Sequence, residues 1–286
     1  MKKLKNAIAS LFLLILTLVL FAACGQETAG DENGESEATV PASVEILKIG
    51  KADCIIINTG TKIVMIDTGE EENYSEIRFY LNQKGYKEID TLILTHYDKD
   101  HIGSATKIID TYGAKTVIEG QKTDKSQRYL DYHQKMDEKG ITPLKLTENY
   151  FFKLDSCEFE IFIPKKNKYE SNNDNNSSLV ISMKCGEVRF LFCADALEER
   201  MAEIIGDIQE KYDLIKLPHH GSYLENYNEI LKTLSPKYGV ITCSNKNPTD
   251  ERTLSALADY GVDVYQTRLG QISIYTDGRE ISINQK

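Results

Sequence analysis

The chain has 286 residues, of which 44 are acidic and 34 are basic, so its formal net charge is −10. A chain this acidic does not carry the broad basic surface of proteins that hold nucleic acid by charge alone. Its only long apolar run lies at the N-terminus, so the sequence does not predict a channel built from many membrane-spanning helices.

The N-terminal segment has the pattern of a secretory signal. Three lysines stand among the first five residues, an apolar run covers residues 7–23, and Cys24 follows a pair of alanines. This order resembles the lipobox of bacterial lipoproteins, in which the cysteine is lipidated and becomes the mature N-terminus. We therefore expect a signal peptide over residues 1–23 and a lipid anchor on Cys24. The alternative is an uncleaved membrane anchor, and both interpretations place the remaining chain outside the cytoplasm, attached to a membrane.

Replacing the expected lipidation site tests this interpretation. Cys24→Ser should block both lipidation and processing, because serine offers no thiol for the lipid. The size of the precursor and its partition into a detergent phase would be compared with those of the wild type. A serine variant that is processed and retained like the wild type would contradict the expected lipid anchor.

The next segment changes in composition. Residues 24–43 carry five acids, no bases and almost no large apolar side chain, so they cannot bury enough surface to offset the entropy of ordering. We expect them to form a disordered acidic tether. From residue 44 to residue 286 the sequence is dense in valine, isoleucine, leucine and phenylalanine, and no second linker interrupts it. One domain over 44–286 is therefore expected.

Strands and helices alternate along this domain. Period-two and apolar runs predict strands over 44–49, 54–58, 62–67, 90–95, 115–120, 159–164, 178–184, 188–195, 212–218, 238–243, 262–267 and 272–276. Helical spacing predicts helices over 73–85, 104–113, 124–139, 196–206, 224–234 and 250–260. The order fits an α/β fold of two sheets packed face to face with helices outside, although the pattern alone leaves the topology open.

Polar residues gather at the carboxyl ends of four of the predicted strands, as the last residue of the strand or directly after it. They are Asp67, the stretch 96–101, Asp195 and the pair His219-His220, and together they contain four of the five histidines of the chain. Because open α/β sheets place their sites at the carboxyl ends of strands, these loops are expected to share one edge. Only His133 stands elsewhere, where a solvated helix face is the simplest interpretation.

The stretch 96–101 has the composition of a metal site. His96 and Asp98 can point the same way from an extended chain, and Asp100 and His101 can turn to the other side at the start of a helix. Two imidazoles and two carboxylates in six residues exceed the needs of a structural ion pair. With another aspartate and another histidine they match a site for two divalent cations, which activates water for hydrolysis.

The chain resembles the metallo-β-lactamase superfamily, whose signature is a His-x-His-x-Asp-His loop after a strand. Here Asp98 replaces the second histidine. This variant, with "NNSSLVI", the strand-ending Asp195 and "LPHHGS", is similar to the extracytoplasmic nuclease domain of ComEC-type competence proteins. The resemblance covers essentially 44–286, and it implies an αββα sandwich of two mixed β-sheets with outer helices.

The resemblance also implies roles for the site residues. His96 and Asp98 would hold one cation and Asp100 and His101 the other, with Asp195 bridging them. His219 is favoured as the ligand that joins them, which leaves His220, with Asp100, as the catalytic candidate. The supporting residues would be Asp67, which orients the histidine loop, and Asn176 or Ser177, which stand where many relatives supply a further histidine. Asn247 replaces a histidine of competence-type relatives.

The implied activity is that of a metal-dependent phosphodiesterase or nuclease. Two divalent cations are expected, Mn²⁺ or Zn²⁺, with Mg²⁺ as a further option. Aspartate in place of histidine makes the site harder and more negative, which favours Mn²⁺ or Mg²⁺ beside Zn²⁺. The alternatives are a metallo-esterase or lactonase, acting on phosphocholine or another small ester, and a non-catalytic surface-binding lipoprotein. No sequence feature indicates a protein partner. The five cysteines after Cys24 are expected as buried free thiols, and the lysine clusters near 122–128 and 165–168 as solvated faces.

Overall fold

The computed structural model describes residues 41–286. The expected signal peptide, the lipidation site Cys24 and nearly all of the expected tether lie outside these residues. The first strand, β1 (Ala42–Ile46), begins two residues before the domain boundary that the composition predicts. Between residues 41 and 286, none of the helices has both the length and the apolar character that crossing a bilayer requires.

Two mixed sheets form the centre of the domain. Antiparallel and parallel pairs occur in both of them, which confirms the predicted sandwich of two mixed sheets. The first sheet contains β1, β2 (Ile55–Asn58), β3 (Ile63–Ile66), β4 (Ile89–Leu94), β5 (Ala114–Glu119), β6 (Leu144–Lys145), β14 (Ile272–Thr276) and β15 (Ile281–Gln285), in the order β15-β14-β1-β2-β3-β4-β5-β6. The second contains β7 (Tyr150–Leu154), β8 (Cys157–Phe162), β9 (Val180–Cys185), β10 (Val188–Phe192), β11 (Leu214–Lys216), β12 (Tyr238–Ile241) and β13 (Asp263–Gln266), in the order β13-β12-β11-β10-β9-β8-β7.

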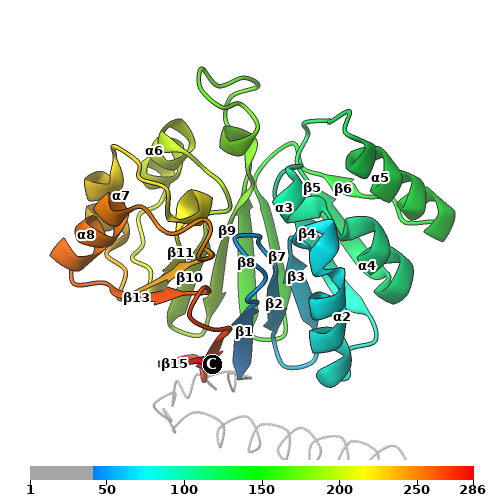
Figure 1. Cartoon of the computed structure of the whole chain (residues 1–286), viewed down its shortest axis with the longest axis horizontal. Coiled ribbons are helices and arrows are strands. Elements are labelled where there is room, and N and C mark those ends of the chain that lie inside the picture. The colour runs from blue at the N-terminus through cyan, green and yellow to red at the C-terminus, as the bar shows by residue number, and fades with distance from the viewer. Residues whose placement is uncertain (1–40) are drawn as a thin grey trace, which may run out of the picture. The chain divides into compact units, whose positions relative to one another are not determined.

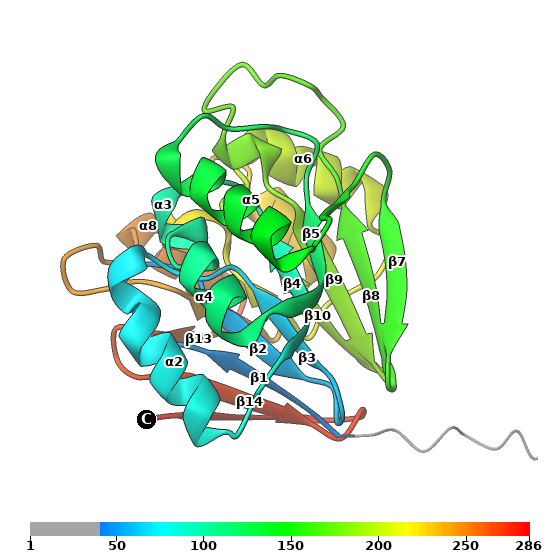
Figure 2. The same cartoon turned by 90° about the vertical axis from the view of Figure 1, so that its right-hand side faces the viewer.

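Helices cover the outer faces of the two sheets. Figure 1 shows one group on each side, with the strands between them, and Figure 2 shows the first group from its own side. The first sheet is covered by α2 (Tyr74–Gln83), α3 (Lys99–Ile102), α4 (Ala105–Tyr112) and α5 (Gln127–Lys139). The second is covered by α6 (Glu198–Asp207), α7 (Tyr227–Leu234) and α8 (Glu251–Asp259). Single 3-10 turns are η1 (Glu71–Asn73), η2 (Asn175–Ser177) and η3 (Pro218–Gly221).

The space between the sheets is the central core. Ile57 and Ile93 from the first sheet and Phe159 and Phe190 from the second all belong to one buried cluster. Each large apolar side chain that is fully buried contributes roughly 1.5–3 kcal/mol. Because helices bury the outer face of each sheet as well, β3 is apolar on both faces. This explains why β3 appears in the sequence as an unbroken apolar run.

The two longer strands that the sequence analysis missed lie at sheet edges. β7 ends the second sheet and β15 ends the first, and residues of both strands alternate between half-buried and exposed. The outward face of β15 carries Ser282 and Asn284, and that of β7 carries Lys153 together with the exposed Phe151. Edge strands have one neighbour and little burial, so their apolar pattern is weak.

The expectation of free thiols is wrong for two cysteines. Cys157 in β8 and Cys185 in β9 form a disulfide, while Cys54, Cys193 and Cys243 are free and buried. The pair stands directly opposite in the antiparallel register of these strands, with Cα atoms 4.3 Å apart. Sequence spacing alone does not reveal this pairing, because it depends on the strand register.

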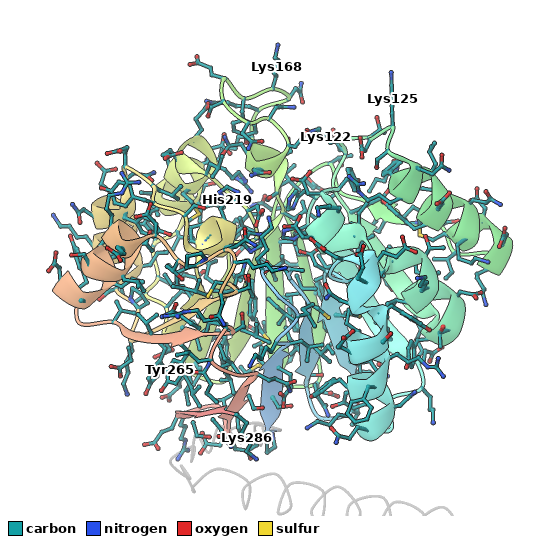
Figure 3. The ribbon with its side chains drawn as sticks, viewed as in Figure 1. Lys122, Lys125, Lys168, His219, Tyr265 and Lys286 are labelled. Carbon is teal, nitrogen blue, oxygen red and sulfur yellow. A yellow bond between two sulfur atoms is a disulfide. The ribbon has the colours of Figure 1, made fainter. Side chains whose placement is uncertain are left out.

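The parallel strands bring the polar loops to one edge. β3, β4 and β5 run parallel in the first sheet, and β10, β11 and β12 run parallel in the second. The loops that follow β3, β4, β10 and β11 carry Asp67, the stretch 96–101, Asp195 and the histidine pair. They meet at the carboxyl ends of the strands, where Figure 3 places His219 between the two groups of helices.

Candidate metal centre

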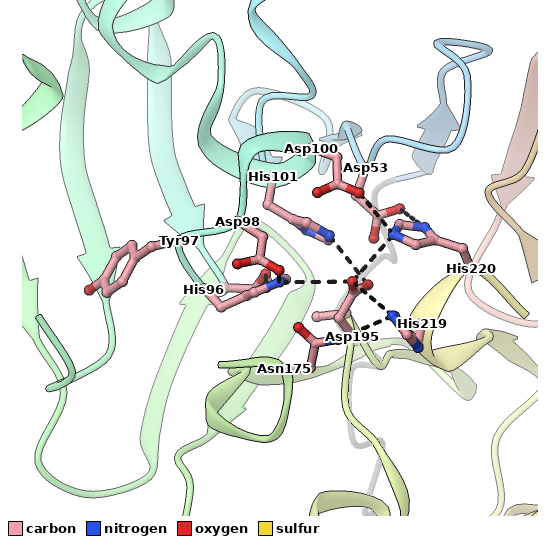
Figure 4. A network of polar contacts seen from close by, with 12 residues as sticks. Asp53, His96, Tyr97, Asp98, Asp100, His101, Asn175, Asp195, His219 and His220 are labelled. Atoms are coloured by element: carbon pink, nitrogen blue, oxygen red, sulfur yellow. Dashed lines mark hydrogen bonds and ion pairs between the residues drawn. The ribbon is translucent and has the colours of Figure 1, made fainter. Parts of the chain in front are cut away.

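Three imidazoles face one buried carboxylate at this edge. Asp195 lies 3.3 Å from His101 Nε2, 3.3 Å from His220 Nε2 and 3.8 Å from His96 Nε2. Asp100 joins the group, because its Oδ2 lies 3.4 Å from His220 Nε2. Figure 4 shows these side chains converging from three loops. We call His96, Asp100, His101, Asp195 and His220 the ligand cluster.

Asp67 fixes the orientation of His96 and His101, the two histidines of the stretch 96–101. Its carboxylate accepts hydrogen bonds from the Thr95 amide at 2.8 Å and the Thr95 hydroxyl at 2.7 Å, and His101 Nδ1 lies at 2.7 Å. Since the Thr95 hydroxyl donates to Asp67, its oxygen accepts from His96 Nδ1 at 3.1 Å. Both rings therefore carry a proton on Nδ1 and turn Nε2 toward the ligand cluster. Hydrogen bonds of this kind orient metal-binding histidines.

Asp53 has the same role for His220, and the sequence analysis missed it. The Thr242 hydroxyl donates to Asp53 Oδ1 at 2.6 Å and accepts from His220 Nδ1 at 3.0 Å. The other Asp53 oxygen pairs with the ammonium of Lys216, whose side chain is 0% exposed. A lysine inside the apolar run "LIKLP" was the available sequence signal, because a buried lysine needs an acidic partner.

The ligand cluster contains buried polar atoms without partners. Within residues 41–286, hydrogen-bond partners are missing for the Nε2 atoms of His96, His101 and His220 and for Asp195 Oδ1, whereas Asp100 Oδ2 is paired with the ammonium group of Lys51 at 2.6 Å. Leaving so many buried polar atoms unpaired is costly. Two groups, His96-His101-Asp195 and Asp100-His101-His220, each have ligand atoms within 4.8 Å of one another. Imidazole and carboxylate groups bind divalent transition metals, so these residues fit such cations.

Charge in the ligand cluster is divided unevenly. Burial and the neighbouring His101 lower the pKa of His96 well below its usual value. Burial would also lower the pKa of His101, but Asp195 and Asp67 raise it well above its usual value. Burial would raise the pKa of Asp195, which His220 and His101 instead hold well below its usual range. Protons on imidazoles thus compensate the buried carboxylates, and bound cations would displace those protons.

Backbone strain is concentrated beside the ligand cluster. Asp67, Ala194, His219 and His220 all have positive φ, at 59°, 49°, 45° and 55°. Residues other than glycine adopt this region at a cost of order 1–3 kcal/mol, and they do so where surrounding contacts require it. The strained turns follow β3, β10 and β11 and aim the side chains of Asp67, Asp195 and His220 inward.

The structure distinguishes the two adjacent histidines. His220 is 8% exposed and faces both Asp100 and Asp195. His219 is 29% exposed, lies 3.9 Å from Asp195, and its Nε2 accepts from Asn175 Nδ2 at 3.1 Å. The geometry therefore favours His220 as the ligand and leaves His219 at the mouth of the site, the reverse of the assignment favoured from the sequence.

Asp98 and the loop with Asn175, Asn176 and Ser177 lie at the rim of the ligand cluster. Asp98 is 44% exposed, and its Oδ2 lies 3.8 Å from His96 Nε2. Asn176 Oδ1 instead accepts from the amides of Leu197 and Arg200 at the start of α6, and Ser177 donates to the Asn173 carbonyl. The side chain of this loop that meets the histidines is Asn175.

A cavity opens next to the rim. The residues that line its inner part include His96, Asp98, Lys122 and Ser177. An adjoining cavity of about 200 Å³ shares Lys122 and Ser177 and is also lined by Lys166. The two lysines come from the clusters that were expected to be solvated. Lys122 pairs with Asp174, and Lys166 pairs with Glu199 at 2.9 Å. Figure 3 shows Lys122, Lys125 and Lys168 along this upper edge.

His133 lies away from the ligand cluster but is not solvated as expected. Its side chain is 23% exposed, and Nε2 lies 3.2 Å from the buried carboxylate of Glu119. Tyr132 donates to the same oxygen at 2.7 Å. The interpretation as a solvated helix face was wrong because the period of α5 places both aromatic residues toward the first sheet.

The comparisons with known proteins agree with this geometry. Residues 48–244 match the protein family described as the metallo-beta-lactamase superfamily. ComE operon protein 3 of Bacillus subtilis is 25% identical over 266 residues, covering 81% of this chain and 34% of that protein. Competence protein ComA of Neisseria gonorrhoeae is 23% identical over 241 residues, covering 80% of this chain and 31% of that protein. The chain therefore spans about a third of the length of these curated relatives.

Two solved structures share the fold. YhfI from Bacillus subtilis, described as a metallo-beta-lactamase fold protein, has a TM-score of 0.54 at 12% identity, covering 85% of this chain and 100% of that one. CmlA from Streptomyces venezuelae, described as a diiron beta-hydroxylase, has a TM-score of 0.55 at 14% identity, covering 86% of this chain and 54% of that one. At these identities the likeness concerns the fold alone.

Proposed function

Because the chain belongs to the metallo-beta-lactamase superfamily, we propose that it is a metal-dependent hydrolase of phosphodiester bonds, with nucleic acid as its substrate class. The observation that carries the proposal is the ligand cluster. Three Nε2 atoms and one oxygen of Asp195 are buried, face one another and, within residues 41–286, have no hydrogen-bond partner, and Asp100 lies beside them. Fold alone does not determine function, so the proposal rests on this site.

The residues divide into ligands and supports. His96, His101, His220, Asp100 and Asp195 would hold two divalent cations, and Asp98 would join His96 from the rim. Bound divalent cations supply hydroxide from water near neutral pH and offset negative charge on the phosphoryl oxygens. Asp195 would lie between the cations, because its carboxylate faces the imidazoles from both candidate groups.

The supports keep the ligand atoms in place. Asp67 holds His101 directly and His96 through Thr95, and Asp53 holds His220 through Thr242. These bonds fix the tautomers before any cation arrives, so little reorganisation is needed on binding. Asn175 orients His219 at the mouth, where its partly exposed ring can contact a substrate.

Two observations favour phosphodiesters and the harder metals. Asp98 in place of a histidine adds a carboxylate to the ligand set, which suits Mn²⁺ better than an all-imidazole set does. Two proteins similar to this chain have names that refer to competence and to recombination, Competence protein ComA and Recombination protein 2 of Haemophilus influenzae, the latter at 25% identity over 210 residues, and these names support nucleic acid as the substrate class. The acidic surface predicts weak binding of long DNA that decreases further with salt.

Location and domain organisation are part of the same proposal. A signal peptide over residues 1–23, a lipid on Cys24 and a tether over 24–43 would hold the domain 44–286 outside a bacterial membrane. The lysine-led apolar run and the acidic composition after it support this arrangement. A tethered enzyme of this kind would meet its substrate at the outer face of the membrane.

A substrate panel tests the proposed reaction. Purified protein loaded with Mn²⁺ is expected to hydrolyse bis(p-nitrophenyl) phosphate, and single-stranded DNA at low ionic strength, while ampicillin and simple lactones react poorly. Asp98→Ala and His101→Ala should each remove the activity, since each takes a ligand from one cation. Rapid turnover of a lactone or a phosphocholine ester, with both phosphodiesters untouched, would favour the esterase. No turnover of any substrate would favour the non-catalytic binding lipoprotein.

A further inference from the structure

Lys51 places an ammonium group at the edge of the ligand cluster. Its Nζ lies 2.6 Å from Asp100 Oδ2, and the same oxygen lies 3.4 Å from His220 Nε2. The side chain of Lys51 is 34% exposed, whereas that of Asp100 is 6% exposed. The ammonium group of Lys51 thus contacts a buried candidate ligand and remains accessible to a molecule that arrives from solvent.

The backbone around Lys51 is fixed relative to the ligand cluster. Gly50 precedes it with φ of 79°, a conformation that glycine adopts without strain, and so forms a tight turn before β2. The turn is closed by a hydrogen bond from the Leu47 amide to the Cys54 carbonyl at 3.2 Å. The Asp53 amide donates to the Asp100 carbonyl at 3.0 Å, which ties the turn to the loop after β4. The ammonium therefore has a defined position beside Asp100.

Lys51 differs from the second lysine near the site. Lys216 is fully buried and neutralises Asp53 from behind His220, where a substrate has no access. Lys51 lies on the solvent side. Its pairing with Asp100 is partly exposed, and a partly exposed ion pair contributes little to stability. A structural role alone therefore gives a weak reason for an ammonium group at this position.

We propose that Lys51 binds an anionic oxygen of the substrate and thereby makes the site selective for phosphodiesters over neutral esters. The proposal rests on the proposed function, of which it specifies the substrate class. A phosphodiester carries a negative charge on its non-bridging oxygens, whereas a lactone or a simple carboxylic ester carries none. Charge-assisted hydrogen bonds from an ammonium group to such an oxygen are roughly twice as strong as neutral ones.

Binding of inorganic phosphate tests this role without hydrolysis. Phosphate would be titrated by calorimetry into the Mn²⁺-loaded wild type, Lys51→Gln and Lys51→Arg, with metal per chain measured on the same samples. Lys51→Gln is expected to weaken phosphate binding about 10-fold or more, the loss expected for one charge-assisted hydrogen bond to an anion. Lys51→Arg should retain most of the affinity, and metal per chain should stay unchanged in both variants.

Lys115→Gln is the matched control. Lys115 is also a paired lysine, 2.8 Å from both Glu88 and Asp90, but it stands near the start of β5, at the opposite end of the strand from the site. Its replacement should leave phosphate affinity unchanged.

Three outcomes would overturn the role of Lys51. They are a wild type that does not bind phosphate, equal affinity in Lys51→Gln, and a change of metal content in that variant, which would make Lys51 part of cation binding. A protein that binds phosphate through Lys51 but cleaves no diester would refute the proposed reaction and leave the anion site standing.

Discussion

Asp195→Ala is expected to lose bound metal and to reduce hydrolysis of bis(p-nitrophenyl) phosphate by at least about 1,000-fold, the scale seen when a group needed in the transition state is removed. The Asp195 carboxylate faces His96, His101 and His220, so it touches the ligands of both candidate cation positions. Without it, two cations would lie close together with no anion between them. Metal per chain, measured by mass spectrometry, and the rate would be determined on the same preparation.

The histidine pair provides the comparison. His220→Ala should also lose metal, because His220 Nε2 belongs to the ligand cluster, whereas His219→Ala should keep it, because His219 Nε2 is engaged by Asn175. Equal metal content in Asp195→Ala and the wild type would refute the bridging role. Metal loss in His219→Ala combined with retention in His220→Ala would restore the order inferred from the sequence.

Asp53→Ala is expected to destabilise the fold by about 3–5 kcal/mol, because it leaves the buried ammonium of Lys216 without its partner. Burial would raise the pKa of Asp53, but Lys216, His101 and His220 hold it below its usual value, so the carboxylate is charged in the folded protein. The free energy of unfolding would be measured by urea denaturation of metal-free protein, so that loss of metal does not contribute.

A double variant shows how much of the stability loss comes from the unpaired charge of Lys216 and how much from lost packing. Asp53→Ala with Lys216→Met removes both charges, and it should recover much of the stability lost in Asp53→Ala. If Asp53→Ala is as stable as the wild type, Asp53 and Lys216 do not form a buried ion pair. A double variant no more stable than Asp53→Ala would assign the loss to packing instead.

The sequence predicted the layers and most of the ligand cluster, for a physical reason. Buried parts of strands in a doubly covered sheet are apolar on both faces, so β3 and the carboxyl-terminal parts of β4 and β10 stand out, and the polar residues that follow them are easy to locate. His96, Asp98, Asp100 and His101 also lie within one short loop. Their proximity therefore needs no knowledge of the tertiary fold.

What the sequence could not predict depends on contacts between distant segments. Asp53 reaches His220 through Thr242, and these three residues come from three separate parts of the chain. The choice between His219 and His220 depends on two positive-φ residues in one turn, which reverse the directions that a regular backbone would give. The disulfide between Cys157 and Cys185 likewise depends on strand register.

Metal-dependent hydrolysis of a phosphodiester is the most direct test of the central claim. Chelator-treated protein would be titrated with Mn²⁺ while the hydrolysis of bis(p-nitrophenyl) phosphate is followed. We expect no hydrolysis before metal is added, and a rate that rises and saturates at about two cations per chain, as a two-cation site requires. A rate that does not depend on metal, or the absence of hydrolysis at every Mn²⁺ concentration, would contradict the account.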